Sequence, residues 1–337
     1  MNKNIIEINN LSASFDSYAG NVQAVRNVSF YVKKGETLAI VGESGSGKSV
    51  TVQSLMRLIA SPPGKVEANS VLHNGKDIMS LSEKQMEKLR GNEISMIFQD
   101  PMTSLNPTMT IGKQISEVIR KHKRISRKEA LHIAEELLKE VGIPNSRESL
   151  KRFPHMLSGG MRQRVVIAIA IACSPKLLIA DEPTTALDVT TQAQIIELIN
   201  RLKKQHETSV LIITHDLGVV ARMADRIAVM YSGKIVETGT AEDIFYNPRH
   251  PYTIGLLSSI PAKNREQVGK LSTIQGTPPD LVNPPPGCSF APRCKFAMNI
   301  CWQEEPVNVE VDAEHHSQCW LLDEKAPEIN WSSLKEM

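Results

Sequence analysis

Short apolar runs alternate with longer charged segments along most of the chain. The run at 37–41, TLAIV, lies between Gly35 and Gly42, and similar runs occupy 177–180 and 210–214. Apolar runs of this length, bounded by glycine or polar residues, predict strands that are buried on both faces. Because strands that alternate with helices form a mostly parallel sheet, the pattern predicts an α/β fold.

The segment between about residues 100 and 173 has a different pattern. Charged and apolar residues recur there with the period of a helix, as in RKEALHIAEELLKEVG at 127–142, with Gly142 and Pro144 as stop signals. We therefore expect a helical subdomain at about 100–173, inserted into the α/β core.

The pattern changes again beyond residue 255. The chain becomes rich in proline, with TPPD at 277–280 and NPPPG at 283–287, and then rich in cysteine. Proline-rich stretches of this kind mark linkers. We expect one large domain at 1–255 and a small cysteine-rich C-terminal extension at 256–337.

Composition and charge narrow the range of functions. Hydrophobic residues make up 41% and charged residues 23% of the 337 residues, and 39 Lys and Arg nearly balance 37 Asp and Glu. This balance argues against nucleic-acid binding driven by bulk charge. No apolar run approaches the roughly 20 residues that span a bilayer, and the start, MNKNIIEINN, lacks the apolar core of a signal peptide. We therefore expect a cytoplasmic chain that would serve a membrane only by docking on other chains.

A glycine-rich loop follows the first apolar run. Residues 42–49, GESGSGKS, match G-x-x-x-x-G-K-[ST], and a helix is expected from Ser49 to the break at SPPG, 61–64. In such a P-loop the backbone N–H groups surround phosphates, Lys48 reaches the β- and γ-phosphates, and the Ser49 hydroxyl coordinates magnesium. The loop thus predicts a site for ATP and Mg²⁺. Its expected nucleotide-binding residues are Gly42, Glu43, Ser44, Gly45, Ser46, Gly47, Lys48, Ser49 and Val50.

Carboxylates end the second apolar run, at Asp181 and Glu182. On a parallel sheet both would emerge at the carboxyl edge beside the P-loop, where Asp181 can hold magnesium and Glu182 can polarise the attacking water. Gln99 and His215 also follow apolar runs and could reach the same edge. The alternatives are an acidic strand end that faces solvent and a structural histidine.

The order and spacing of further motifs resemble the ATP-binding cassette (ABC) ATPases over most of residues 5–255. The motifs are Leu157-Ser158-Gly159-Gly160, Asp181-Glu182, Ala186-Leu187-Asp188 and His215. The resemblance implies that Gln99 contacts magnesium and the attacking water, and that Asp188 is the D-loop residue. It also implies that His215 is a switch histidine that supports the γ-phosphate.

The same resemblance makes Leu157–Gly160 the signature motif, which in such dimers acts on ATP bound to the opposite subunit. Its glycines and the helix N-terminus that follows suit this task, since exposed N–H groups and the helix dipole favour a phosphate. The chain alone should therefore hydrolyse ATP inefficiently. Met161 departs from the commonest family pattern, which has glutamine there, and this puts one polar contact near the nucleotide in doubt.

The adenine partner is less well defined by the sequence. Members of the family usually stack an aromatic side chain from the N-terminal strands on the base, and Phe15 or Tyr18 could do so. We favour Phe15. For both residues the alternative is packing against the first strands.

Longer segments are similar to the oligopeptide and dipeptide importer branch of this family. They are FQDPMTSLNP at 98–107, LSGGMRQR at 157–164, NPRHPYT at 247–253 and SIP at 259–261. The resemblance implies a peripheral subunit on the cytoplasmic face of the membrane, paired with a second ABC ATPase subunit as a heterodimer. Two transmembrane permeases and an extracytoplasmic substrate-binding protein would complete a peptide importer that binds no nucleic acid, with its coupling surface on the helices after Gln99.

Other functions remain open from the sequence. One is a soluble ABC ATPase that acts on ribosomes or in DNA repair, although such proteins tend to carry tandem cassettes or a long coiled coil, and this chain shows one P-loop and no sustained heptads. Another is uptake of nickel or other small solutes. A third is a metal or redox sensor in which the ATPase is secondary.

The cysteines form a candidate metal site. Four of the five gather in the extension, at Cys288, Cys294, Cys301 and Cys319. Thiolates are soft ligands for zinc or an iron–sulfur cluster, but the tight C-x-x-C pairs of many zinc sites are missing. Relatives with this tail look like carriers of a [4Fe–4S] cluster; zinc and free buried thiols are the alternatives. His315 and His316 could replace a ligand or could be solvated, and Cys173 is expected in the core.

Overall fold

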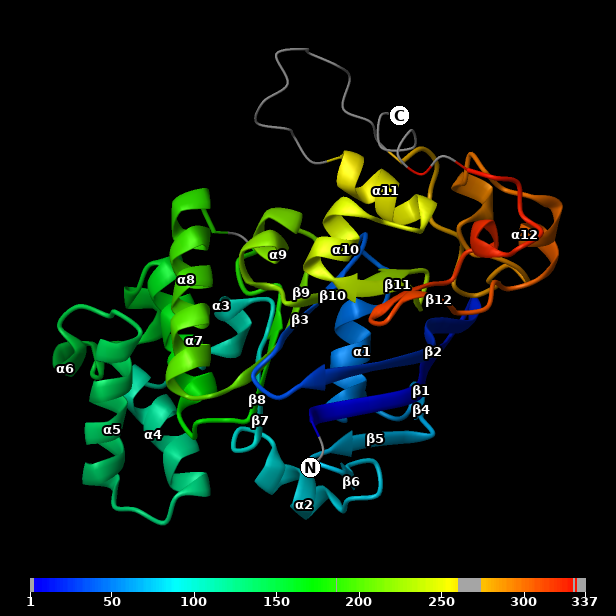
Figure 1. Ribbon diagram of the computed structural model, residues 1–337. Helices are drawn as coiled ribbons and strands as arrows, with labels where there is room; N and C mark the ends of the chain where they lie inside the picture. The colour runs from blue at the N-terminus through cyan, green and yellow to red at the C-terminus, as the bar shows by residue number, and fades with distance from the viewer. Residues whose placement is uncertain (1–2, 186, 260–273, 330, 332–337) are drawn as a thin grey trace, which may run out of the picture. The chain divides into compact units, whose positions relative to one another are not determined.

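A computed structural model describes residues 3–185, 187–259, 274–329 and 331 of the chain (Figure 1). The chain divides into two compact units, each built from several stretches of sequence. The helical unit comprises Met1–Ile6, Tyr31–Thr37 and Leu72–Thr214, and the P-loop unit comprises Glu7–Phe30, Leu38–Val71 and His215–Met337. The expected boundary near residue 255 stays a prediction, and the SIP segment at 259–261 lies largely outside the described residues. In the described part of the chain no helix is long and apolar enough to cross a membrane.

Parallel strands form the sheet of the helical unit. The strand β8 (Leu177–Asp181) pairs with β7 (Ile94–Ile97) on one side and with β9 (Ser209–Thr214) on the other. Every residue of these strands is buried, which explains their unbroken apolar sequence. The strands predicted at 177–180 and 210–214 are confirmed, each one residue longer than expected.

The chain between β7 and β8 is mostly helical. Its elements are α3 (Pro101–Ser104), α4 (Ile111–His122), α5 (Arg127–Glu140), α6 (Ser146–Ser149), the 3₁₀ turn η1 (Pro154–Met156) and α7 (Gly159–Ile171). A capping box of Ser126 and Glu129 begins α5, and Gly142, with a φ of 77°, stops the chain from continuing as a helix. Figure 1 shows α4 and α5 side by side. The inserted helices are confirmed, and their expected bounds at 100–173 stay a prediction.

The remaining elements of the helical unit lie before and after this insertion in the sequence. They are β6 (Lys76–Asp77), α2 (Glu83–Leu89) and α8 (Val189–Gln205). The strand β5 (Ser70–His73) crosses the division between the units and pairs with β6 through Leu72 and His73.

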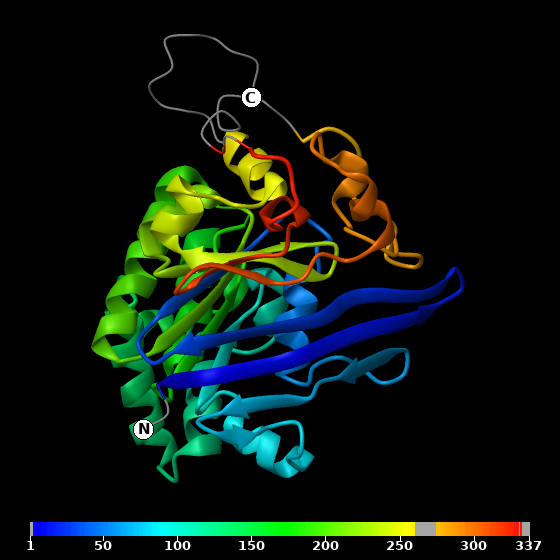
Figure 2. The same ribbon diagram turned by 45° about the vertical axis from the view of Figure 1, so that its right-hand side comes forward.

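Two long strands contribute most of their residues to the P-loop unit. Figure 2 shows β1 (Asn4–Ser17) and β2 (Gly20–Lys33) as neighbours, and β4 (Gly64–Glu67) pairs antiparallel with β1. The strand β3 (Thr37–Val41) pairs in parallel with β10 (Arg226–Tyr231). Because all residues of β3 are buried, the strand predicted at 37–41 is confirmed.

Helices of the P-loop unit are short. They are α1 (Lys48–Leu55), α9 (Leu217–Met223), α10 (Ala241–Tyr246), α11 (Pro251–Ser258), α12 (Asn299–Gln303) and the 3₁₀ turns η2 (Ala291–Arg293) and η3 (Trp320–Leu322). The prediction that the first helix continues to the prolines at 61–64 is wrong. A Schellman motif ends it earlier: Arg57 adopts a left-handed φ of 51° and Leu58 N–H donates to Gln53 O at 2.9 Å.

Strands of the C-terminal extension pair with a strand of the P-loop unit. The strand β11 (Lys234–Thr240) pairs antiparallel with β10 and with β13 (His315–Ser317), and β12 (Val309–Asp312) pairs with β13. The register aligns Glu237 with Ser317 and Thr238 with His316. Strand pairing of this kind ties the extension to the unit that contains the P-loop.

A buried carboxylate lies under this strand pair. The Glu237 side chain is 0% exposed, and its oxygens accept hydrogen bonds from Arg249 N–H at 2.5 Å, His250 N–H at 3.1 Å and His315 Nε2 at 2.8 Å. The expectation that His315 is solvated is therefore wrong, because pairing with Glu237 takes it into the interior. Burial also lowers the pKa of His250 to about 3, so that its imidazole stays neutral at physiological pH.

We predict that Glu237→Ala lowers the free energy of unfolding by about 3 kcal/mol, because it leaves buried donors without an acceptor. Urea denaturation followed by tryptophan fluorescence measures the loss, since all three tryptophans lie in the extension. Glu310→Ala, on an exposed residue of β12, is the matched control and should shift stability by less than about 0.5 kcal/mol. Equal stability of the two variants would contradict the role of Glu237.

Candidate active site

The P-loop needs glycine where its backbone passes other strands. A Cβ on Gly42 would lie 2.1 Å from Met230 O on β10, and a Cβ on Gly47 would lie 2.3 Å from Ala24 O on β2. Both glycines also have positive φ angles, 155° and 101°. Only a residue without a side chain fits at these two positions. The strand, glycine loop and helix expected from the sequence are present, because β3 ends at Val41 and α1 begins at Lys48.

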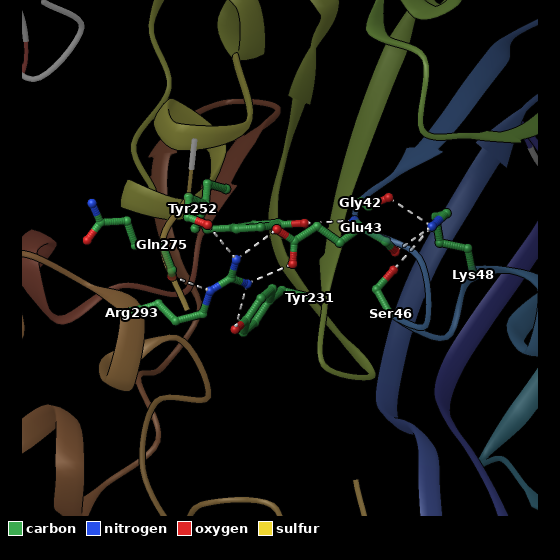
Figure 3. Close-up of polar contacts among 9 residues, drawn as sticks. Gly42, Glu43, Ser46, Lys48, Tyr231, Tyr252, Gln275 and Arg293 are labelled. Atoms are coloured by element: carbon green, nitrogen blue, oxygen red, sulfur yellow. Dashed lines mark hydrogen bonds and ion pairs between the residues drawn. The ribbon is translucent and has the colours of Figure 1, made fainter. Parts of the chain in front are cut away.

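Lys48 begins α1 and folds over the loop. Its side chain is buried, and Nζ donates to Gly42 O and Glu43 O at 2.8 Å and lies 3.4 Å from Ser46 Oγ (Figure 3). Phosphate oxygens would compete with these acceptors for the same ammonium hydrogens. The first turn of α1 also carries Ser49, and a helix N-terminus favours bound phosphate.

The backbone bends sharply at the end of β8. Asp181 is the last residue of the strand and is 2% exposed. Glu182 has a φ of 47°, a left-handed conformation that residues other than glycine seldom adopt, and its N–H donates to Ile213 O of β9 at 2.8 Å. Asp181 therefore stays in the buried sheet, while Glu182 lies beyond it and is only half-buried.

The Glu182 carboxylate is held in place by neighbours in the helical unit. Its Oε2 accepts hydrogen bonds from Gln99 Nε2 and from Thr185 Oγ1, both at 2.9 Å. The structure thus brings Gln99 and Glu182 together, and their roles in hydrolysis stay predictions. Sequence analysis missed Thr185. Its place three residues after Glu182, where a hydroxyl can bond back to a neighbouring group, was the available signal.

The signature motif and Asp188 lie at two helix starts in the helical unit. Ser158 caps α7 by accepting from Met161 N–H at 3.4 Å. Asp188 caps α8 by accepting from Thr191 N–H at 3.0 Å and Thr191 Oγ1 at 2.7 Å, and these bonds lower its pKa. A Cβ on Gly160 would lie 2.8 Å from the Thr191 side chain. The two caps are therefore neighbours, and Gly160 is required for their close approach.

Sequence-predicted site residues fall in both units. The P-loop unit holds Phe15, His215 and residues 42–50 of the loop, and the helical unit holds Gln99, Asp181, Glu182, Asp188 and Leu157–Gly160. That both sets meet around one nucleotide stays a prediction. Phe15 is half-buried on β1 opposite Gly64, whereas Tyr18 is fully exposed. The choice of Phe15 as the adenine partner also stays a prediction.

The four cysteines of the extension form no disulfide, and their surroundings are largely buried. Burial raises the pKa of Cys288 and of Cys319, and raises that of Cys294 to about 11, with the other thiols of the group adding to the shift. Phe296 N–H donates to Cys294 Sγ at 3.4 Å. Among the described residues no three His, Cys, Asp or Glu side chains lie where they could hold a metal ion. The iron–sulfur cluster is thus not confirmed. Cys173 is buried, as expected of a core residue.

Comparison with protein families gives two matches. Residues 25–185 match the family described as ABC transporter, which covers the P-loop and the Asp181–Glu182 strand end. Residues 236–301 match the family described as oligopeptide/dipeptide transporter, C-terminal region. The second match begins in β11 and includes Cys288, Cys294 and Cys301.

Known proteins resemble the chain over nearly its full length. It is 58% identical to the oligopeptide transport ATP-binding protein OppD of Bacillus subtilis, over 96% of this chain and 91% of that protein. It is 55% identical to the dipeptide transport ATP-binding protein DppD of Lactococcus lactis, over 96% and 93%. Among solved structures, the dimeric ATP-binding cassette MJ0796 bound to ADP and Pi has a TM-score of 0.62 at 28% identity, over 70% of this chain and 98% of that one.

We predict that Glu182→Gln lowers the ATP hydrolysis rate by about 100-fold or more, because the amide cannot take a proton from the attacking water. Nucleotide affinity should stay within about twofold, since the substitution keeps the shape of the side chain. Phosphate release and nucleotide titration, both on the chain with its co-purifying subunits, measure the two effects. Glu197→Gln, at an exposed position of α8, is the matched control. Hydrolysis by Glu182→Gln at the rate of this control would refute the assignment.

Proposed function

Because the chain belongs to the ATP-binding subunits of ABC transporters, in the oligopeptide and dipeptide branch, we propose that it drives peptide uptake by hydrolysing ATP. The observation that carries this proposal is its identity of 58% and 55% with ATP-binding proteins of oligopeptide and dipeptide transport, over 96% of the chain. The P-loop and the Gln99–Glu182 contact supply the parts that such an ATPase requires. Nickel or another small solute is the alternative cargo.

The residues divide the work of hydrolysis. Lys48 binds the β- and γ-phosphates with its ammonium group, while the P-loop N–H groups hold the remaining phosphate oxygens. Glu182 accepts a proton from the attacking water, and Gln99 orients that water through the contact it makes with Glu182. His215 supports the γ-phosphate.

Magnesium fits the chemistry of the residues proposed to hold it. Ser49, Gln99 and Asp181 offer oxygen atoms, the donors that this hard cation prefers, and Asp181 brings a nearly buried carboxylate. When bound, the ion neutralises the charge that develops on the phosphate oxygens.

The similarity to peptide-transport ATP-binding proteins supports a proposal for the partners. We propose that Leu157–Gly160 acts on ATP held by a second ABC ATPase subunit, so that a heterodimer closes on ATP and reopens after hydrolysis. The dimer would lie at the cytoplasmic face of the membrane, on two transmembrane permeases that an extracytoplasmic substrate-binding protein supplies.

The coupling surface is proposed to lie just after Gln99. Phe98 is 42% exposed and Met102, on α3, is 59% exposed, although large apolar side chains normally avoid water when they have no partner to bind. Arg162 Nη1 contacts the Met102 sulfur, and Arg162 lies on α7, the helix that the signature motif begins. A permease that bound Met102 would therefore touch a segment linked to both Gln99 and the signature.

We predict that Met102→Asp abolishes co-purification of permeases with the chain from detergent-solubilised membranes of its host, while ATP binding is retained. Val307→Asp, at a residue that is 63% exposed in the extension, is the matched control and should keep the permeases. The measurement is affinity purification with mass spectrometry, followed by uptake of labelled peptides and of Ni²⁺. Recovery of the unaltered chain with ribosomal or DNA-repair proteins instead of permeases would replace the transport proposal.

The extension is further proposed to hold a [4Fe–4S] cluster on Cys288, Cys294, Cys301 and Cys319. What supports it is that four cysteines, whose thiolates are soft ligands for iron, gather in one segment of the extension.

We predict that Cys288→Ser removes most of the iron and the visible iron–sulfur absorption from protein purified without oxygen. Cys173→Ser, which changes a buried cysteine outside the extension, should retain both. Iron analysis and the absorption spectrum provide the measurements. Iron content in Cys288→Ser that matched Cys173→Ser would exclude Cys288 as a ligand.

A further inference from the structure

An arginine of the C-terminal extension forms a bidentate ion pair with a residue of the P-loop. Arg293 ends η2, directly before Cys294, and its guanidinium donates to both oxygens of Glu43, the second residue of the P-loop (Figure 3). The Nη1–Oε2 distance is 2.7 Å and the Nη2–Oε1 distance is 3.0 Å. The Arg293 side chain is 5% exposed and that of Glu43 is 27% exposed. This is the paired, bidentate geometry that makes arginine–carboxylate contacts strong and directional.

Contacts other than those with Glu43 also hold the Arg293 guanidinium in place. Nε donates to Gln275 O at 3.0 Å, Nη2 donates to Ile274 O at 3.2 Å, and the guanidinium carbon lies 5.7 Å from the centre of the Tyr231 ring. The bonds to Glu43 raise the Arg293 pKa, so the group stays charged. Arg293 is therefore a rigid cation presented to the P-loop by the extension.

Glu43 connects this cation to the nucleotide-binding machinery. Its N–H donates to the Tyr252 hydroxyl at 2.9 Å, and its C=O accepts from Lys48 Nζ at 2.8 Å. Tyr252, on α11, is fully buried and packs with Tyr231 and Phe290, at ring-centre distances of 4.6 and 5.5 Å. The carboxylate, N–H and carbonyl of one P-loop residue are thus tied to the extension, to α11 and to the phosphate-binding lysine.

We propose that Arg293 is a positioning residue for ATP binding, which acts through Glu43 to hold the P-loop in shape and to neutralise its carboxylate. Without the guanidinium, an uncompensated negative charge would lie in the loop that must accept a triphosphate. The backbone of Glu43, and with it the carbonyl that Lys48 contacts, would also lose an anchor. The proposal rests on nucleotide binding by the P-loop, and it needs neither peptide cargo nor an iron–sulfur cluster.

We predict that Arg293→Gln weakens Mg·ATP binding by the full-length chain by about tenfold, the effect of losing a charge-assisted hydrogen-bond pair. Arg293→Lys should recover part of this loss, to within about threefold of the unaltered chain, because it keeps the charge but not the fork. In a chain that carries Glu43→Gln, adding Arg293→Gln should change affinity by less than about twofold. Titration with a fluorescent ATP analogue and competition by Mg·ATP measure all five proteins: the unaltered chain, the three single variants and the double variant.

A matched control separates positioning of the P-loop from general loosening of the extension. Arg26 donates to Glu305 at 2.9 Å and to Ser289 at 3.1 Å, so it also joins an early strand to the extension through a partly buried ion pair. Arg26→Gln should leave ATP affinity within about twofold of the unaltered chain. An equal loss in Arg26→Gln, or an Arg293→Gln effect that persists with Glu43→Gln, would overturn the proposal. Failure of the unaltered chain to bind ATP would instead refute the proposed function.

Discussion

The close approach of the P-loop backbone to its neighbouring strands is the constraint on which the nucleotide site depends. Gly42 passes Met230 O and Gly47 passes Ala24 O at distances that leave no room for a side chain. These contacts fix the path of the loop backbone at Gly42 and at Gly47, so that its N–H groups can surround a phosphate. Between these two glycines, Glu43 connects the loop to the extension through its side-chain carboxylate.

The position of the Glu182 carboxylate depends on backbone strain. Glu182 adopts a left-handed backbone that costs free energy for a residue with a side chain. Its N–H bond to Ile213 and its carboxylate bonds to Gln99 and Thr185 hold that conformation. The helical unit thus orients the carboxylate that we propose as the catalytic base with its own residues.

Local patterns predicted the parts of the structure that depend on local causes. Unbroken apolar sequence predicts the buried strands at 37–41, 177–180 and 210–214. The glycines that its tight path requires predict the P-loop. The sequence places the end of α1 too late, at the prolines, because proline is a stop signal that can be read from sequence. The Schellman motif that ends the helix earlier has an arginine in the left-handed position, and arginine gives no such signal. His315 was misjudged, and Arg293 and Glu237 were missed, because each meets a partner at least twelve residues away in the sequence. No period or spacing reveals such pairs.

The polar contacts of the extension serve to specify its position more than to add stability. Removing a charge from water costs about as much as the ion pair returns, so a buried pair contributes little net free energy. The buried His315–Glu237 pair instead disfavours wrong registers of β13. A shift of β13 by one residue would remove His315 from Glu237 and leave a fully buried carboxylate short of a donor. The correct register is therefore strongly preferred, and the chain that leads from Arg293 to β13 is anchored at both ends, at the P-loop by Glu43 and at β11 by Glu237. An extension held in this way keeps Arg293 in contact with the loop that binds ATP.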